Sequence, residues 1–510
     1  MWSRHGRKIF WILLLLEASI IVINGAITPV SLGDESHHFR FAQNIYNTGK
    51  RAPFDPLYES GNPPGFFNND PPLWHFGLAF LWKLTGGISQ TIAQFYHIIF
   101  LILLIWITSI LAKEFTGKDE GGWFSALIIA TVPMVVSFST LFYMDIPMTA
   151  LATLSFYFIM KKRYIEAGVS SGLAYFTKLN SGFFFPGFLL VIFRDERGKI
   201  WNLLKSFAFF LLPILLIYIP DVFWRGENLT SQLNVNGKVM KKVVENGVGN
   251  VIGMKAIADR LHTLHVTGPV YKENLISYWT NPVDLVKYLG LALLFLILFY
   301  LFNFRRWARK DLYFWIPVIS YLISFLIFFG KQSDIRYLMP LLPFLVVLVT
   351  PSFLSLGKKW RFVIIGICIL QFLSATYYVH QRRQISPEVK EAFAYIRKNV
   401  PQNALILYPE ENLLIYAQRR VIWSAVKVSK DRNVSLQTIF WGRTTEEMNQ
   451  ALRINEIDYI LIKKSRIYDD REVRHVGGYP QSFVDRLPHL EGWVKIFENQ
   501  GTVLWNKVPS

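Results

Sequence analysis

The chain has 510 residues, of which 52% are hydrophobic and 18% are charged, and its formal net charge is +18. This composition, together with repeated long apolar runs, argues against a soluble globular protein. The basic residues form short clusters between the apolar runs, which favours a membrane protein that obeys the positive-inside rule over a nucleic-acid-binding protein. The single cysteine, Cys368, excludes a disulfide within the chain.

The first apolar run, residues 9–27, follows Arg4, Arg7 and Lys8. Because no small-residue cleavage site is obvious, we interpret this run as a retained membrane helix rather than a signal peptide. Further spans are expected at residues 91–112, 122–138, 146–160, 165–176, 183–193, 201–219, 283–304, 312–329, 337–354 and 362–379. Two of them, at 165–176 and 183–193, are shorter than the roughly 20 residues that a bilayer requires and are expected to form a pair of short helices.

The basic clusters in short loops then all fall on one side of the membrane, which predicts about eleven spans and a cytoplasmic N-terminus. Residues 31–90 and the C-terminal segment are expected on the other side, in the plasma or inner membrane or, in a eukaryote, the endoplasmic reticulum. The predicted fold class is therefore an α-helical polytopic membrane protein.

The C-terminal segment, residues 380–510, is polar and has the alternating patterns of a small α/β domain outside the cytoplasm. Helices are expected at 387–399 and 446–455, and strands at 404–408, 457–462 and 494–497. The predicted domains are thus residues 1–379, in the membrane, and residues 380–510. No constellation of acidic and phosphate-binding residues stands out in the second domain.

Three acidic residues are expected at the outer surface. Asp34, beside Glu35, follows the first span, Asp70 precedes two prolines, and Asp145 lies between the third and fourth spans. A carboxylate at the edge of the membrane can bind protons more tightly than usual and act as a general base. Each of these residues also fits an ordinary helix N-terminus, and Asp34 could simply cap a helix over residues 36–45.

Two cationic residues are expected on the same surface. Lys178 lies at the joint of the two short helices, and Arg336, followed by Tyr337, begins the tenth span. Either side chain could bind a lipid phosphate, because Arg offers paired donors and Lys a point charge. The alternative is that both reach towards the lipid headgroups without binding a substrate.

The order and spacing of these motifs resemble the protein O-mannosyltransferase and lipid A aminoarabinose transferase family (glycosyltransferase family 39-like), whose members share the GT-C membrane fold. The resemblance covers residues 7–379. It implies inverting transfer of a sugar from a polyprenyl-phosphate donor outside the cytoplasm. Under this resemblance Asp34 is the catalytic acidic residue, Glu35 shapes the same turn, and Asp145 is the second outer acidic site. Lys178 and Arg336 lie near the donor phosphate.

The chain departs from the family pattern at two places. Asn69-Asp70-Pro71-Pro72 stands where family members often carry Glu-Lys-Pro-Pro, and the His-Lys-X-Pro pattern expected before residue 283 is missing. Lys272 stands near that second place and, with Arg225 and Tyr337, is a further candidate for the phosphate. Asp70 and His265 are the candidate ligands of a divalent metal ion, which stays open as a cofactor.

We therefore predict an integral membrane glycosyltransferase that transfers a hexose or pentose from a polyprenyl-phosphate sugar, with membrane lipids as its surroundings. The acceptor, a lipid, a glycan or a protein, stays open. The alternative is a transporter or flippase for a lipid-linked or anionic substrate. A transporter would place ionisable residues near the middle of the bilayer, where only Glu17 is expected.

Overall fold

The structure is a computed structural model. It describes residues 15–16, 18–20, 23, 30, 34–52, 54–55, 58–59, 66–67, 71–198, 200–234, 282–302, 310–329, 335–383, 385–410, 412–422, 439–440, 444–469 and 478–508. The chain divides into two compact units. The first comprises Met1–Ile27 and Asn69–Arg382, and the second comprises Thr28–Asn68 and Arg383–Ser510. This grouping differs from the predicted division at residue 379 mainly by joining residues 28–68 to the C-terminal segment.

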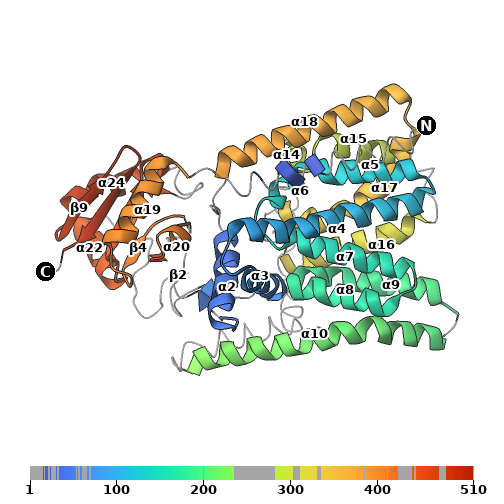
Figure 1. Ribbon diagram of the computed structural model, residues 1–510, viewed down its shortest axis with the longest axis horizontal. Coiled ribbons are helices and arrows are strands. Elements are labelled where there is room, and N and C mark those ends of the chain that lie inside the picture. The colour runs from blue at the N-terminus through green and yellow to red at the C-terminus, as the bar shows by residue number, and fades with distance from the viewer. Residues whose placement is uncertain are drawn as a thin grey trace. The chain divides into compact units, whose positions relative to one another are not determined.

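The first unit is a bundle of helices, in which α4, α7, α8 and α10 run side by side (Figure 1). Its elements are α3 Leu73–Thr85, α4 Gln90–Thr116, α5 Asp119–Thr131, α6 Pro133–Ser139, α7 Asp145–Met160, α8 Tyr164–Thr177, η1 Leu179–Phe184, α9 Phe185–Glu196, α10 Ile200–Asn234, α14 Pro282–Leu289, α15 Leu291–Phe302, α16 Asp311–Phe329, η3 Ile335–Leu341, α17 Leu342–Ser355 and α18 Lys358–Arg383. The predicted spans from residue 91 to residue 379 all coincide with helices of this bundle.

The predicted count of about eleven spans is not confirmed. Among the described residues, four helices are long and apolar enough to cross a membrane, namely Gln90–Thr116, Ile200–Asp221, Arg336–Ser355 and Lys358–Gln381. The bent pair α5 and α6 could supply a fifth. Three further predicted spans correspond to apolar helices of 10–17 residues in the described part of the chain, namely Asp145–Met160, Leu291–Phe302 and Asp311–Phe325. The predicted spans at 122–138 and 283–304 are each interrupted.

Both interruptions have clear causes. Val132 precedes Pro133 and therefore avoids the helical region, with φ −58° and ψ 123°. The helix axis bends by 62° at this point. The span expected over 283–304 is divided at Gly290, whose φ of +80° lies in the left-handed region that glycine tolerates best.

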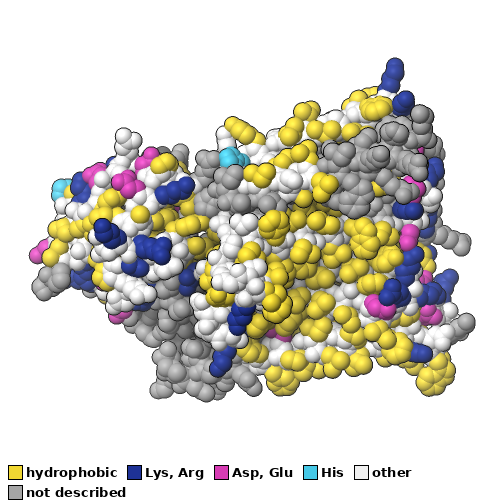
Figure 2. All heavy atoms as spheres, viewed as in Figure 1, with side chains coloured by type: hydrophobic (Ala, Val, Ile, Leu, Met, Phe, Trp, Pro, Cys, Tyr) yellow, Lys and Arg dark blue, Asp and Glu magenta, His cyan; other side chains and the backbone are white. Residues whose placement is uncertain are grey.

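The surface of the first unit is largely apolar in the view of Figure 2. On α4 the exposed side chains Phe95, Ile99, Ile102 and Trp106 are spaced by four, three and four residues and are 39–58% exposed. This spacing places them on one face of the helix. A water-facing stripe would be polar, so hydrocarbon is the solvent that suits this face.

The basic clusters of the short loops meet at one end of the first unit. Lys161, at the end of α7, pairs with Glu114 of α4, and Lys162 pairs with Glu196 of α9. Arg361, near the start of α18, reaches Glu120 at the start of α5. The structure therefore brings together the charges that the positive-inside argument had placed on one side. Which compartment that side faces stays a prediction.

The second unit contains a six-stranded sheet in the order β2-β5-β4-β6-β10-β9. The strands are β2 Tyr58–Glu59, β4 Leu405–Leu407, β5 Arg420–Ile422, β6 Tyr459–Lys463, β9 Trp493–Glu498 and β10 Thr502–Lys507. The strands β2, β5, β4 and β6 are parallel, and β10 runs antiparallel to both of its neighbours. Two-residue pairs β1 Phe54–Asp55 with β3 Phe66–Phe67, and β7 Ile467–Tyr468 with β8 Tyr479–Pro480, stand outside it.

Helices cover both faces of this sheet. Ile406 of β4 and Leu461 of β6 pack with α19 Pro387–Asn399 and α20 Asn412–Tyr416. Their neighbours Leu407 and Ile460 belong to the other core, with α22 Thr445–Ile454 and α24 Gln481–Arg486. Alternate residues of a strand point to opposite faces, so a strand buried on both faces is apolar throughout.

The predicted elements of the C-terminal segment agree with this sheet. The helix expected over 387–399 is α19, with the same bounds, and the helix expected over 446–455 is α22. The strands expected at 404–408, 457–462 and 494–497 are β4, β6 and β9. The sequence analysis did not find β5, β10 or the participation of residues 58–59.

Candidate functional site

The first unit holds a buried ion pair between α7 and the end of α8. Lys178 Nζ lies 2.7 Å from Asp145 Oδ1 and 2.8 Å from Oδ2. The carboxylate is fully buried, and the lysine side chain is 15% exposed. A pair with both oxygens engaged keeps two charges in an apolar bundle that neither could occupy alone at low cost.

Local structure explains why both charges lie at helix ends. Asp145 is in the first turn of α7, where the helix dipole stabilises a negative charge. Lys178 follows the last residue of α8 in an extended conformation, with φ −154° and ψ 129°, before η1 begins. This break is the joint that the sequence predicted between the two short helices.

Two tyrosine rings link this pair to a second cation. Lys178 Nζ lies 5.3 Å from the centre of the Tyr337 ring, and Arg336 Cζ lies 5.5 Å from the same ring. Arg336 Cζ also lies 5.0 Å from the ring of Tyr143, which comes two residues before Asp145. The site thus contains two cations, one carboxylate and two rings, which come from the turn before α7, the start of α7, the α8–η1 joint and η3. Cation–π contacts at these distances hold the charged groups without neutralising them.

A chain of hydrogen bonds fixes the backbone beneath the site. Asn180 Nδ2 donates to the Tyr321 hydroxyl at 3.3 Å, and that hydroxyl donates to the Tyr337 carbonyl oxygen at 2.8 Å. Tyr321 is fully buried. The contacts join η1, α16 and η3, so the position of Tyr337 depends on elements far apart in the sequence.

The sequence analysis missed two residues that hold the turn before Asp145. Gln94 Nε2 of α4 donates to the Thr140 carbonyl at 3.0 Å, and His97 Nε2 donates to the Phe138 carbonyl at 3.2 Å. Both side chains are fully buried. These two contacts tie the end of α6 and the turn after it to α4. Two polar residues three apart in an otherwise apolar run were the available sign.

Asp34 and Glu35, the predicted catalytic residues that follow the first span, lie in the second unit. Asp34 is the first residue of α2 Asp34–Thr48, so the helix begins two residues before the expected start, and the side chain of Asp34 is outside the described residues. Glu35 is fully buried, and the cap alternative for Asp34 stays open. The catalytic roles of both residues stay predictions.

The remaining candidates lie largely outside the described residues. Arg225 belongs to α10, but its side chain is not described, and Lys272, Asp70 and His265 fall in undescribed segments. Within the described part of the chain, no group of three or more His, Cys, Asp or Glu side chains could hold a metal ion. The predicted metal ligands are therefore untested.

Comparison with known proteins identifies the architecture. The family profile described as dolichyl-phosphate-mannose-protein mannosyltransferase matches residues 69–224, which include Asp145 and Lys178. The crystal structure of ArnT from Cupriavidus metallidurans bound to undecaprenyl phosphate superposes with a TM-score of 0.63 at 12% identity, over 100% of this chain and 99% of that chain. This chain has the GT-C fold. The match confirms the resemblance predicted from the order of the outer motifs.

A further solved structure agrees with this GT-C architecture. The oligosaccharyltransferase of Archaeoglobus fulgidus in the apo form superposes with a TM-score of 0.62 at 13% identity, over 98% of this chain and 74% of that chain. An uncharacterized protein of Aquifex aeolicus (strain VF5) is 22% identical over 361 residues. The aligned region is 68% of this chain and 64% of that relative, so it spans less than two thirds of the relative's length.

Proposed function

We propose that this GT-C protein transfers a sugar from a polyprenyl-phosphate donor to a hydroxyl-bearing acceptor. The observation that carries the proposal is the pair of cations, Lys178 and Arg336, gathered around Tyr337 beside the buried carboxylate of Asp145. A transporter is less well supported, because these charges lie at helix ends and joints that form one cluster.

The proposed reaction is a displacement at the anomeric carbon. The acceptor oxygen forms a bond to that carbon while the bond from carbon to the phosphate oxygen breaks, and polyprenyl phosphate leaves. Negative charge develops on the phosphate, where Lys178 and Arg336 would stabilise it. A base removes the hydroxyl proton of the acceptor, and Asp34 is the residue we assign to that task.

Asp145 has a different role in this proposal. Its two contacts with Lys178 hold the ammonium group in one place before a donor arrives. An already oriented charge requires little rearrangement when the phosphate charge develops. Asp145 is therefore a positioning residue for the phosphate-binding lysine.

The choice of donor draws on the relatives. The ArnT structure contains undecaprenyl phosphate, and a structure of the Archaeoglobus oligosaccharyltransferase AglB contains a dolichol-phosphate. Both are lipids with a phosphate on a polyprenyl chain, which suits a site with cations next to an apolar bundle. The sugar is a hexose or pentose in our proposal, the site faces away from the cytoplasm, and the acceptor stays open. No step of the proposed reaction runs through a metal ion.

The test is release of polyprenyl phosphate. The purified protein in lipid nanodiscs is given a panel of undecaprenyl- and dolichyl-phosphate sugars with a membrane extract as acceptor source, and products are followed by mass spectrometry. We expect one donor class to be consumed, and Arg336→Gln to weaken donor use about tenfold or more through loss of a charge-assisted contact. Asp34→Asn should lower turnover by about 10²–10⁴-fold with little change in donor binding. Failure of the folded protein to consume any lipid-linked sugar would contradict the proposal.

A further inference from the structure

The sheet of the second unit has a point at which the strand order reverses. From β4 the chain runs through α20 to β5 on one side. The next strand among the described residues, β6, lies on the other side of β4. The three strands are parallel, so their carboxyl ends share one edge. In open parallel sheets, ligands bind outside the carboxyl ends of the strands at such a reversal.

A cluster of charged side chains occupies this edge. Ile460 of β6 pairs with Leu407 of β4, so Lys463 and Glu410, each three residues further along, emerge side by side. Lys463 Nζ lies 2.7 Å from Glu410 Oε1, and Arg466 Nε lies 3.3 Å from the same oxygen. Lys463 ends β6, and Arg466 ends the short helical turn η5 Lys464–Arg466 that follows it.

The other oxygen of Glu410 is also engaged. The Tyr408 hydroxyl donates to Glu410 Oε2 at 3.3 Å, and Asn412 Nδ2 donates to it at 3.2 Å. Burial by itself raises the pKa of Glu410, but the attraction of Lys463 and Arg466 outweighs burial and lowers that pKa below its ordinary value. The carboxylate is thus ionised, and both of its oxygens already accept hydrogen bonds. It orients the two cations.

The cations themselves keep binding capacity. The Glu410 carboxylate is the one hydrogen-bond partner that Lys463 Nζ has among the described residues, and an ammonium group has three donors. The side chains of Lys463 and Arg466 are 21% and 36% exposed, so solvent reaches both. Asn412 Oδ1 is buried and has no hydrogen-bond partner within the described part of the chain. The cluster therefore carries a net charge of about +1, spare donors and one unused acceptor.

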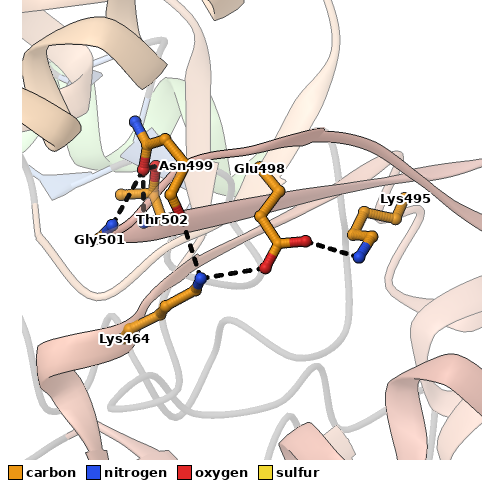
Figure 3. Close-up of polar contacts among 6 residues, drawn as sticks. All are labelled: Lys464, Lys495, Glu498, Asn499, Gly501 and Thr502. Carbon is orange, nitrogen blue, oxygen red and sulfur yellow. Dashed lines mark hydrogen bonds and ion pairs between the residues drawn. The ribbon is translucent and has the colours of Figure 1, made fainter.

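The neighbouring lysine has a different environment. Lys464 Nζ lies 3.0 Å from Glu498 Oε1 and 2.9 Å from the Asn499 carbonyl oxygen, beside the turn between β9 and β10 (Figure 3). Glu498 is shared with Lys495 at 2.6 Å. Lys464 is thus an ordinary surface charge, 38% exposed, one residue away from Lys463.

We propose that the edge formed by Glu410, Lys463 and Arg466 is a second binding site, for a phosphomonoester. A phosphomonoester carries more than one negative charge at neutral pH and presents several acceptor oxygens. Arg466 can offer paired donors and Lys463 a point charge. The site shares no residue with the proposed donor site, and the inference does not depend on the transfer reaction. The group comes either from a soluble phosphomonoester or from a lipid headgroup.

The test measures binding of radiolabelled inorganic phosphate to the full-length protein by equilibrium dialysis, in nanodiscs of phosphatidylcholine. We expect Lys463→Gln to weaken a saturable component of binding about tenfold or more, since a contact with a charged donor is lost. Lys463→Arg should retain that component. Lys464→Gln is the matched control, because it removes the same charge one residue away, and it should bind phosphate like the unmodified protein.

A second arm distinguishes the two sources. In nanodiscs that contain phosphatidic acid, loss of the Lys463-dependent component identifies the lipid headgroup as the ligand, and its persistence identifies a soluble phosphomonoester. Either result supports the site. If Lys463→Gln does not fold, Arg466→Gln replaces it, because that change leaves the Lys463–Glu410 pair intact. Equal phosphate binding by folded variants at positions 463, 464 and 466 would overturn the proposal.

Discussion

The ion pair between Asp145 and Lys178 makes a quantitative prediction about stability. Lys178→Met leaves a fully buried carboxylate with no counter-ion, and Asp145→Asn leaves an almost buried ammonium group. Removing one partner of such a pair costs about 3–5 kcal/mol. The double variant leaves neither charge unpaired, so its cost should be well below the sum, with a coupling energy of about 2 kcal/mol or more.

A matched control comes from the charged end of the same unit. Lys113 and Asp119 also lie 2.7 Å apart, but their side chains are 60% and 38% exposed. An exposed pair contributes about 0–1 kcal/mol, so Lys113→Met should change stability little. Burial, rather than contact distance, is therefore the variable that this comparison isolates.

Equilibrium unfolding in mixed micelles that contain SDS measures the free energy of unfolding. It is applied to the unmodified protein, the two single variants, the double variant and the control Lys113→Met. Stability should largely return in the double variant, whereas sugar transfer should not, because the ammonium group proposed to bind phosphate is still missing. Additive costs of the two single changes, or equal costs for Lys178→Met and Lys113→Met, would refute the reasoning.

Two further predictions concern packing and pH. A Cβ atom at Gly168 of α8 would lie 2.3 Å from the Phe210 carbonyl oxygen, so Gly168→Ala should destabilise the first unit by about 1–3 kcal/mol. Gly366→Ala on α18 should not destabilise it, because a Cβ atom there would have nothing within 4 Å. The same unfolding assay checks both variants, and equal effects would contradict the packing. Glu410→Gln should destabilise the second unit by about 1–3 kcal/mol at pH 7. The pKa of Glu410 is lowered from 4.5, so its contribution is present above that value and is lost as the pH falls through the lowered pKa. Limited proteolysis between pH 7 and pH 3 should show the difference from the unmodified protein disappearing, and a constant difference would argue against an ionised Glu410.

Local patterns in the sequence were enough to locate most elements. The helix at 387–399 was predicted with its observed bounds, because Pro387 at its first turn and an amphipathic repeat are local features. The helices of the membrane unit follow from apolar runs for the same reason. Asp145, Lys178 and Arg336 were recognisable because a charge beside an apolar run is expensive and therefore conspicuous.

The length and continuity of the spans depended on single residues. The sequence contains Pro133 and Gly290, yet neither residue alone says whether a helix bends, breaks or continues. Neighbouring helices settle this, because they supply or withhold partners for the backbone groups that a break exposes. The apolar pattern therefore located the helices of the described residues, whereas the count of about eleven spans stays a prediction.

Contacts between distant segments were decided by the tertiary structure alone. Tyr58 pairs with Val421 in the sheet, and no local pattern around residue 58 indicates a strand of that domain. Glu410 meets Lys463 and Arg466 only because β4 and β6 are adjacent and parallel. Sequence alone determined which residues are apolar, charged or turn-forming. Convergence of side chains from separate elements requires the backbone to close long loops, and which loops close depends on the packing of the whole chain.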